Sequence, residues 1–411
     1  MKKRLFIGSI VFCVILLLGW SVFSFVLNKE VKKEEERERE KEKRIATIQS
    51  HYAPFVQVQK KCGVYQKDGD QYRKIGKVEA GEILSLEERK DSSSSYFSIQ
   101  NRDLYIPYSC VKKTEREKEK NMRYKKYVPF PEKVKTKSGA SFYQDNRKVY
   151  ELFDSVEFPV IKKDNDSYYV EYWDELFQIK KEDISLISEG EVLPFAKEVP
   201  VTAYHFIYPD GDYSCGGIIC HSTSQIRSHF EYLKENHFFT ITTSEMEEFL
   251  DQKIQLPEKS ILITIDDGDR AENIIPLLEE FQVNATLFLI TAWYFPENYS
   301  SSYLELASHT HELHEPGKCA GGQGSALKCL EKSKIVEDLK LSRSVLNGTR
   351  AFCYPLYEYN DHAVDAVLQA GFSLGFIGGQ RKASIHSPKL LIPRITLFHD
   401  TTIEEYIKIV S

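Results

Sequence analysis

The stretch Lys259-Ser-Ile-Leu-Ile-Thr-Ile-Asp-Asp-Gly268 decides how the second half of this chain folds. Its largely apolar run is continuous rather than alternating, which is typical of a strand buried on both faces. Asp266 and Asp267 follow where this strand leaves its sheet, and α/β folds bind their ligands at that edge. Adjacent carboxylates repel each other unless a cation or a shared proton offsets the repulsion. A plain Asp-Asp-Gly turn is the alternative.

A second stretch, Ser308-His-Thr-His-Glu-Leu-His314, places three of the chain's 11 His residues within six positions. A single His is usually structural, but three beside a pair of Asp residues at a strand end indicate metal ligands. Two imidazoles and one carboxylate leave open positions for water and substrate, as in catalytic zinc sites. We therefore predict a metal centre at this edge of the sheet.

Four short motifs, in this order, resemble those of NodB-like polysaccharide deacetylases, carbohydrate esterase family 4. They are Thr264-Ile-Asp-Asp-Gly, Ser308-His-Thr-x-x-x-His, Phe352-Cys-Tyr-Pro-Leu-Tyr and Ile392-Pro-Arg-Ile, preceded by Tyr204-His205 at the start of the region. The resemblance covers residues 194–411. The pair His309 and His314, five apart, resembles the branch that deacetylates poly-N-acetylglucosamine. The resemblance implies an incomplete or distorted (β/α) barrel with its motifs at the carboxyl ends of the strands. The alternation of strand and helix patterns over this region independently predicts a mostly parallel α/β sheet.

The resemblance also implies roles for the residues that match the motifs. Asp267, His309 and His314 would bind a divalent metal, zinc first, with cobalt, nickel or iron as alternatives. Asp266 would be the general base that accepts a proton from the water attacking an acetamide carbonyl. His311 is the rival ligand, because a local helix would favour the pair His311 and His314.

Further catalytic roles follow from the same resemblance. The backbone N–H of Leu356 would stabilise the oxyanion, and a late His, either His399 or His386, would protonate the departing amine. Many relatives orient the base with an Arg in the third motif, where this chain has Cys353. Arg394 is therefore predicted to reach Asp266 from another strand.

The N-terminal half has a different character. Leu5 to Leu27 carries no charged residue and follows Met1-Lys2-Lys3-Arg4, which predicts an uncleaved signal-anchor helix with everything after it outside the cell. The predicted divisions are a cytoplasmic tip and anchor (1–28), a charged stalk (29–50), two small all-β modules (51–115 and, with a connector, 116–193), and the deacetylase-like domain (194–411). The modules resemble bacterial SH3-like repeats, either binding the wall or acting as spacers.

Composition and cysteines agree with an exported protein. The net charge of −6 gives no support for a nucleic-acid partner. Cys62/Cys110, Cys215/Cys220 and Cys319/Cys329 are candidate disulfides, Cys13 lies in the predicted anchor and Cys353 is left over. The Gly-rich segment 317–324 lacks phosphate-loop spacing. We expect it to be a loop beside the metal closed by Cys319–Cys329, with either Cys as an additional ligand as the alternative.

These features together predict a membrane-anchored, extracellular, metal-dependent enzyme. It would remove N-acetyl groups from N-acetylglucosamine units of a surface polysaccharide or peptidoglycan. An O-acetyl esterase acting on xylan-like glycans is one alternative. A catalytically impaired wall-binding scaffold is the other, motivated by the changes at Leu356 and Cys353.

Overall fold

The computed structural model describes residues 2–69, 71–88, 94–100, 102–118, 122–212 and 217–411, without the side chains of residues 2–19 and 21–24. The chain divides into two compact units. Unit 1 comprises Met1–Asn121, Lys135–Glu157 and Glu171–Ser185, and unit 2 comprises Met122–Val134, Phe158–Val170 and Leu186–Ser411. The residues predicted to form the second β module are thus shared between the two units.

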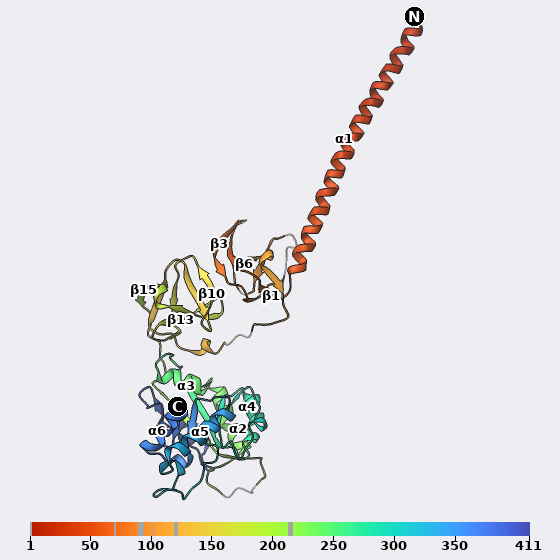
Figure 1. The fold of residues 1–411 in the computed structure, drawn as a ribbon. Coiled ribbons are helices and arrows are strands. Elements are labelled where there is room, and N and C mark those ends of the chain that lie inside the picture. Colours follow the sequence, from red (N-terminus) through yellow and green to blue (C-terminus); the bar gives the residue numbers. More distant parts are fainter. Residues whose placement is uncertain (1, 70, 89–93, 101, 119–121, 213–216) are drawn as a thin grey trace. The chain divides into compact units, whose positions relative to one another are not determined.

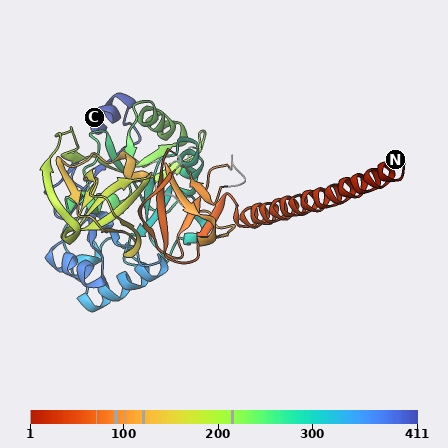
Figure 2. The ribbon, with the colours of Figure 1, turned by 90° about the horizontal axis from the view of Figure 1, so that it is seen from above.

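The N-terminal segment forms one unbroken helix, α1 (Lys2–His51), which Figures 1 and 2 show in two views. It joins the predicted anchor and the charged stalk. Within the part of the chain that the structure describes, we find no helix with the length and apolarity needed to cross a membrane. The predicted span Leu5–Leu27 lies mostly among residues whose side chains are outside that part. The anchor therefore stays a prediction.

Unit 1 is built from antiparallel strands in which buried and solvent-facing residues alternate. Its larger sheet includes, in order, β14, β9, β10, β3, β2, β6 and β5, while β4, β1 and β7 form a smaller sheet. β10 pairs with β3 through Tyr150 and Val78, so strands from both predicted modules share one sheet. The Cys62–Cys110 disulfide is confirmed. The strands are β1 (Phe55–Val58), β2 (Cys62–Asp68), β3 (Gln71–Val78), β4 (Ile83–Ser85), β5 (Tyr96–Ile99), β6 (Leu104–Pro107), β7 (Val111–Lys113), β9 (Ala140–Gln144), β10 (Arg147–Leu152) and β14 (Glu175–Lys180).

The described residues of this stretch also form β8 (Glu132–Thr136), β11 (Glu157–Pro159), β12 (Lys162–Lys163), β13 (Ser167–Tyr172) and β15 (Ile184–Glu189). The all-β character of residues 51–193 is confirmed. The likeness to SH3 repeats, and the choice between wall binding and spacing, stay predictions.

Unit 2 contains a parallel sheet with the order β27-β25-β24-β23-β22-β21-β17-β28, and β20 adds to β21. Helices lie around this sheet in Figure 1. The main strands are β17 (Val201–Tyr204), β20 (Phe239–Thr240), β21 (Ser260–Asp267), β22 (Ala285–Leu289), β23 (Leu304–Ser308), β24 (Ala351–Cys353), β25 (Leu374–Ile377), β27 (Ile392–Pro393) and β28 (Ile395–Thr396). The short pairs are β16 (Glu198–Val199) with β26 (Ala383–Ser384), and β18 (Phe206–Tyr208) with β19 (Cys220–Ser222). The helices are α2 (Thr223–Glu235), α3 (Thr243–Leu250), α4 (Ile275–Phe281), α5 (Lys332–Val345), α6 (Asp361–Ala370) and α7 (Ile403–Val410).

The two ends of the parallel sheet meet at one residue. β27 pairs with β25 and β28 pairs with β17, so the segment 392–396 joins both edges of the sheet. Arg394 is the single residue between these strands, and it is fully buried. The sheet is therefore a nearly closed barrel, which confirms the predicted barrel-like α/β fold.

Strand β21 is buried on both faces, as its continuous apolar run predicted. Ile263 and Ile265 pack with residues of α2 and α4, whereas Leu262 packs with side chains of the neighbouring strands. Because side chains alternate along a strand, Asp266 follows Leu262 on the inner side. Asp267 has φ of 74°, so the regular strand ends there and its carboxylate turns another way.

Candidate active site

Arg394 forms a bidentate ion pair with the Asp266 carboxylate inside the barrel. Its Nη1 donates to Asp266 Oδ1 and its Nη2 donates to Oδ2, both at 2.7 Å. Nη1 also donates to Thr264 Oγ1 at 3.0 Å. Two parallel hydrogen bonds between a guanidinium and a carboxylate fix both planes. The contact that the sequence predicted between Arg394 and Asp266 is therefore present.

The charge of Arg394 decides the ionisation of Asp266. Burial would raise the pKa of Asp266, but the nearby guanidinium and its hydrogen bonds outweigh burial and hold that pKa well below its usual range. Asp266 is thus an ionised carboxylate in a buried position, 2% exposed. It can accept a proton from a group that approaches from the open end of the barrel.

Asp267, His309 and His314 converge on one point. The Nε2 atoms of His309 and His314 each lie 3.3 Å from Asp267 Oδ1. Three such donor atoms lie within 4.8 Å of one another. Ligand atoms about 2.1 Å from a tetrahedral zinc ion are about 3.4 Å apart, so these residues fit such an ion. The set also matches the composition of catalytic zinc sites, which leave a position open.

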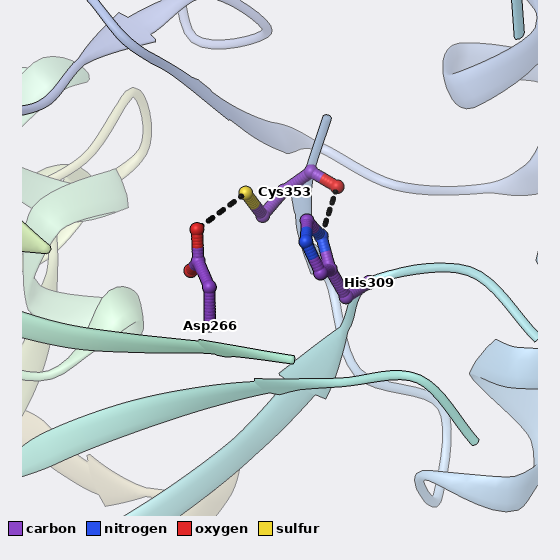
Figure 3. A group of neighbouring side chains, drawn as sticks. All are labelled: Asp266, His309 and Cys353. Carbon is purple, nitrogen blue, oxygen red and sulfur yellow. Dashed lines mark hydrogen bonds between the residues drawn. The ribbon is translucent and has the colours of Figure 1, made fainter. Parts of the chain in front are cut away.

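A backbone contact orients the first of these imidazoles. His309 Nδ1 and the carbonyl oxygen of Cys353 are 2.9 Å apart, so Nδ1–H donates to that oxygen and Nε2 is the ring nitrogen that faces Asp267. Figure 3 shows Cys353 between His309 and Asp266, with its Sγ 3.5 Å from Asp266 Oδ2. Arg394 Nη2 donates to the same sulfur at 2.8 Å. Cys353 thus fills the space beside the base, and Arg394 supplies the positive charge.

The two His side chains differ in their protonation. Burial lowers the pKa of His314 to about 4, so this imidazole is neutral near pH 7. Burial would also lower the pKa of His309, but the acidic groups around it, Cys353 and Asp267 first, raise it well above its usual value. A cation held by Asp267 would compete with the proton on His309.

His311 is not brought into this cluster. Its Nδ1 lies 2.9 Å from Thr291 Oγ1, and its backbone N–H donates to Asp338 Oδ1 at 2.9 Å. Two donor clusters are found among the described residues, Asp267/His309/His314 and Asp266/His309/Cys353, and neither includes His311. The geometry favours the pair His309 and His314 over the rival pair.

The other residues predicted for the site, Leu356, His399 and His386, lie in different parts of the domain. Leu356 lies within the short turn Pro355–Tyr357 after β24, with φ of 58° in the left-handed region. His399 is hydrogen-bonded to Ile218 O and lines a cavity of about 710 Å³ with Asp210 and His221. Among the described residues His399 has no contact with Asp266. His386 is exposed.

The structure adds His205, which the sequence analysis did not assign to the site. Its Nε2 lies 3.6 Å from Asp266 Oδ2 and 3.3 Å from the hydroxyl of Tyr357. Burial lowers the pKa of His205, although Asp266 and Asp267 oppose this shift. The sequence signal that could have placed His205 in the site is its position directly after β17, the strand that pairs with β21. Tyr204 pairs with Ile265, so the residues that follow them, His205 and Asp266, lie side by side.

Comparison with known proteins identifies this part of the chain. Residues 253–375 match the family model for polysaccharide deacetylase. The C-terminal part of the chain is a polysaccharide deacetylase domain. The chain is similar to the poly-beta-1,6-N-acetyl-D-glucosamine N-deacetylase of Staphylococcus aureus strain MSSA476, with 29% identity over 209 residues, 46% of this chain and 70% of that protein. The protein of that name from Staphylococcus epidermidis is 28% identical and covers 44% of this chain and 70% of its own length.

Two solved structures are similar to about half of this chain. A de-N-acetylase from Aggregatibacter actinomycetemcomitans has 22% identity and a TM-score of 0.45, covering 52% of this chain and 99% of its own. IcaB from Ammonifex degensii has 20% identity and a TM-score of 0.42, covering 53% and 97%.

The Gly-rich loop of the deacetylase domain is closed as predicted. Cys319 and Cys329 form a disulfide, which removes both thiols as metal ligands. The Glu358 carboxylate accepts backbone N–H groups from Gln323 and, at 2.8 Å, from Ser325. A carboxylate of the protein thus occupies the donors that a phosphate would need. Cys215, from the remaining predicted pair, lies outside the described residues.

Proposed function

We propose that this chain is a metal-dependent deacetylase that hydrolyses N-acetyl groups of N-acetylglucosamine units in a surface polysaccharide or peptidoglycan. The observation that carries the proposal is the convergence of Asp267, His309 and His314 beside Asp266, which Arg394 holds ionised. The names of the staphylococcal relatives support N-acetylglucosamine as the sugar.

A divalent metal held by Asp267, His309 and His314 would supply Lewis acidity and a water molecule of lowered pKa. Asp266 accepts the proton of the water that attacks the acetamide carbonyl. The backbone N–H of Leu356 donates to the oxygen on which negative charge develops. Arg394 keeps Asp266 ionised and in one orientation until that proton arrives.

The departing amine needs a proton before it can leave. His205 Nε2 lies 3.6 Å from Asp266 Oδ2. A proton that Asp266 has accepted can therefore pass to His205, and from His205 to the amine nitrogen. The sequence predicted His399 for this step, so a His399 variant is compared with a His205 variant. We expect His205→Ala to lower kcat more than His399→Ala does.

We further propose that the N-terminal helix anchors the protein in the membrane and that the deacetylase domain acts outside the cell. The charge-free segment Leu5 to Leu27 and the preceding basic residues support this arrangement. The disulfides Cys62–Cys110 and Cys319–Cys329 suit an oxidising compartment. Protease added to intact cells tests it: digestion of the deacetylase domain supports the orientation, and protection contradicts it.

Acetate release tests the activity. Purified protein is incubated with poly-N-acetylglucosamine, chitin oligosaccharides, peptidoglycan and acetylated xylan, with Asp266→Asn as the matched control. Acetate from an N-acetylglucosamine polymer, lost in the variant, supports the proposal. Release from xylan alone indicates the esterase alternative, and no release from any substrate indicates the scaffold.

A further inference from the structure

The third His of the second motif, His311, joins two loops. Its backbone carbonyl accepts the N–H of Ala292 at 3.0 Å, and its Nδ1 lies 2.9 Å from Thr291 Oγ1. The N–H of Thr291 also donates to the carbonyl of Thr310 at 3.2 Å. Three contacts therefore connect Thr310 and His311 to the loop that follows β22.

Asp338 of α5 holds the same segment from the other side. Its carboxylate oxygens accept the backbone N–H groups of His311 and Glu312 at 2.9 and 2.8 Å. His311 is thus fixed between a helix and the loop after β22. Because His311 is held in place, its contacts also fix the position of the loop after β22 and of the residues that follow Ala292 in it.

That loop carries Trp293. Trp293 is 48% exposed, although tryptophan is mostly buried in folded proteins. The ring lies edge-to-face against the imidazole of His314, with centroids 6.0 Å apart and planes at 75°. The N–H of Trp293 donates to Ile290 O at 3.0 Å, which fixes its backbone. About half of Trp293 is therefore exposed to solvent beside a candidate metal ligand.

We propose that Trp293 is the binding surface for the sugar ring whose acetamide enters the metal centre, and that His311 is the positioning residue that holds Trp293 there. This inference rests on the proposed function and specifies how its substrate is recognised. A pyranose ring has apolar faces and polar edges, which suits a rigid amphipathic indole. The contact with His314 makes this surface continuous with the centre, so the occupant is the N-acetylhexosamine being deacetylated.

Kinetics with two substrates test the role of Trp293. We expect Trp293→Ala to raise KM for N-acetylglucosamine oligosaccharides about 3- to 10-fold, the size of one aromatic contact. Turnover of 4-nitrophenyl acetate, which has no sugar ring, should not change. Phe295→Ala is the matched control, because Phe295 lies on the same loop, is 61% exposed and has no ring contact among the described residues. Equal KM values for the two variants would overturn the inference while leaving the proposed function standing.

Fluorescence gives a readout that does not depend on turnover. The chain has three Trp residues, so Trp293 contributes a large share of the emission. In an Asp266→Asn background, adding chitin oligosaccharide should change the emission, and Trp293→Phe should abolish the change. This result would support the inference even if the parent protein released no acetate, an outcome that overturns the proposed function alone. A change that persists in Trp293→Phe overturns the inference.

The positioning role of His311 has its own test. We expect His311→Ala to raise KM as Trp293→Ala does, to keep the zinc content of the parent, and to add little to Trp293→Ala in the double variant. His311→Asn, which can still place a polar atom against Thr291 Oγ1, should restore most of the KM. Loss of zinc in His311→Ala would identify a ligand, and additive effects would identify independent roles. Either result overturns the positioning role.

Discussion

Replacing Arg394 with Met isolates the buried ion pair at the closure of the barrel. Arg394 and Asp266 have side chains that are 0% and 1% exposed, joined by two hydrogen bonds of 2.7 Å. Met fills much of the same space, so the main loss is the charge that neutralises Asp266. Removing one partner of a buried pair costs about 3–5 kcal/mol. For a domain of this size that is a fall in Tm of roughly 6–20 °C.

The same variant reverses the pH dependence of stability. In the parent the folded pKa of Asp266 is depressed, so its ionisation stabilises the fold above the ordinary aspartate pKa of 3.8, and this stability is lost as the pH falls toward the folded value. In Arg394→Met the guanidinium no longer opposes burial, and we expect burial to outweigh the remaining influence of His309 and His205 and to raise the pKa of Asp266. Stability is then greatest when Asp266 is protonated and falls as the pH rises through the new pKa. We expect the Tm gap between variant and parent to narrow from pH 7 to pH 4.

Differential scanning calorimetry with a matched pair measures both effects. Arg227 and Glu280 form a bidentate ion pair at 2.6 and 2.8 Å, but their side chains are 41% and 50% exposed. Because solvent screens that pair, Arg227→Met should change Tm little. If Arg394→Met and Arg227→Met had the same Tm, the buried ion pair would not carry the predicted stability. A Tm difference between Arg394→Met and the parent that did not depend on pH would also contradict the prediction.

Three further predictions concern the centre and its loop. Asp266→Asn should lower kcat about 10²- to 10⁴-fold and keep its zinc, because it removes a base and no ligand; zinc loss measured by mass spectrometry would contradict this. Zinc affinity of the parent should fall as the pH drops, since protons compete for His309, whose pKa is raised, rather than for His314, whose pKa is about 4; a calorimetric titration in which the loss begins only near pH 4 would contradict it. Replacing both Cys319 and Cys329 with Ser, which opens a loop with a sequence separation of 10, should lower the free energy of unfolding by about 2–3 kcal/mol; an unchanged denaturation midpoint would contradict this.

Local patterns predicted the elements that carry the site. The continuous apolar run before Asp266 is a buried strand, and this feature depends only on neighbouring residues within one segment. The choice of His309 and His314 came from the family resemblance, because a local helix would have favoured His311 and His314; in the structure both imidazoles of the first pair lie beside Asp267. The contact of Arg394 with Asp266 was predicted from the Cys at the third motif, and the closure of the barrel explains how it forms.

Features that depend on strand pairing were harder to predict. His205 lies beside Asp266 because β17 and β21 are parallel neighbours in one register, which no local pattern specifies. The pairing of β10 with β3, which joins strands of the two predicted β modules, is of the same kind. The proposed positioning role of His311 could not be predicted from the sequence either, because it depends on a contact with Thr291, which lies in a different loop.

Metal reconstitution tests whether Asp267, His309 and His314 form a catalytic metal centre. The protein is stripped with a chelator and titrated with zinc while acetate release from poly-N-acetylglucosamine is followed. A centre made by Asp267, His309 and His314 predicts no activity in the stripped protein and full activity at one zinc per chain. Undiminished acetate release after stripping, or zinc restoring activity equally in a His314→Ala variant, would contradict it.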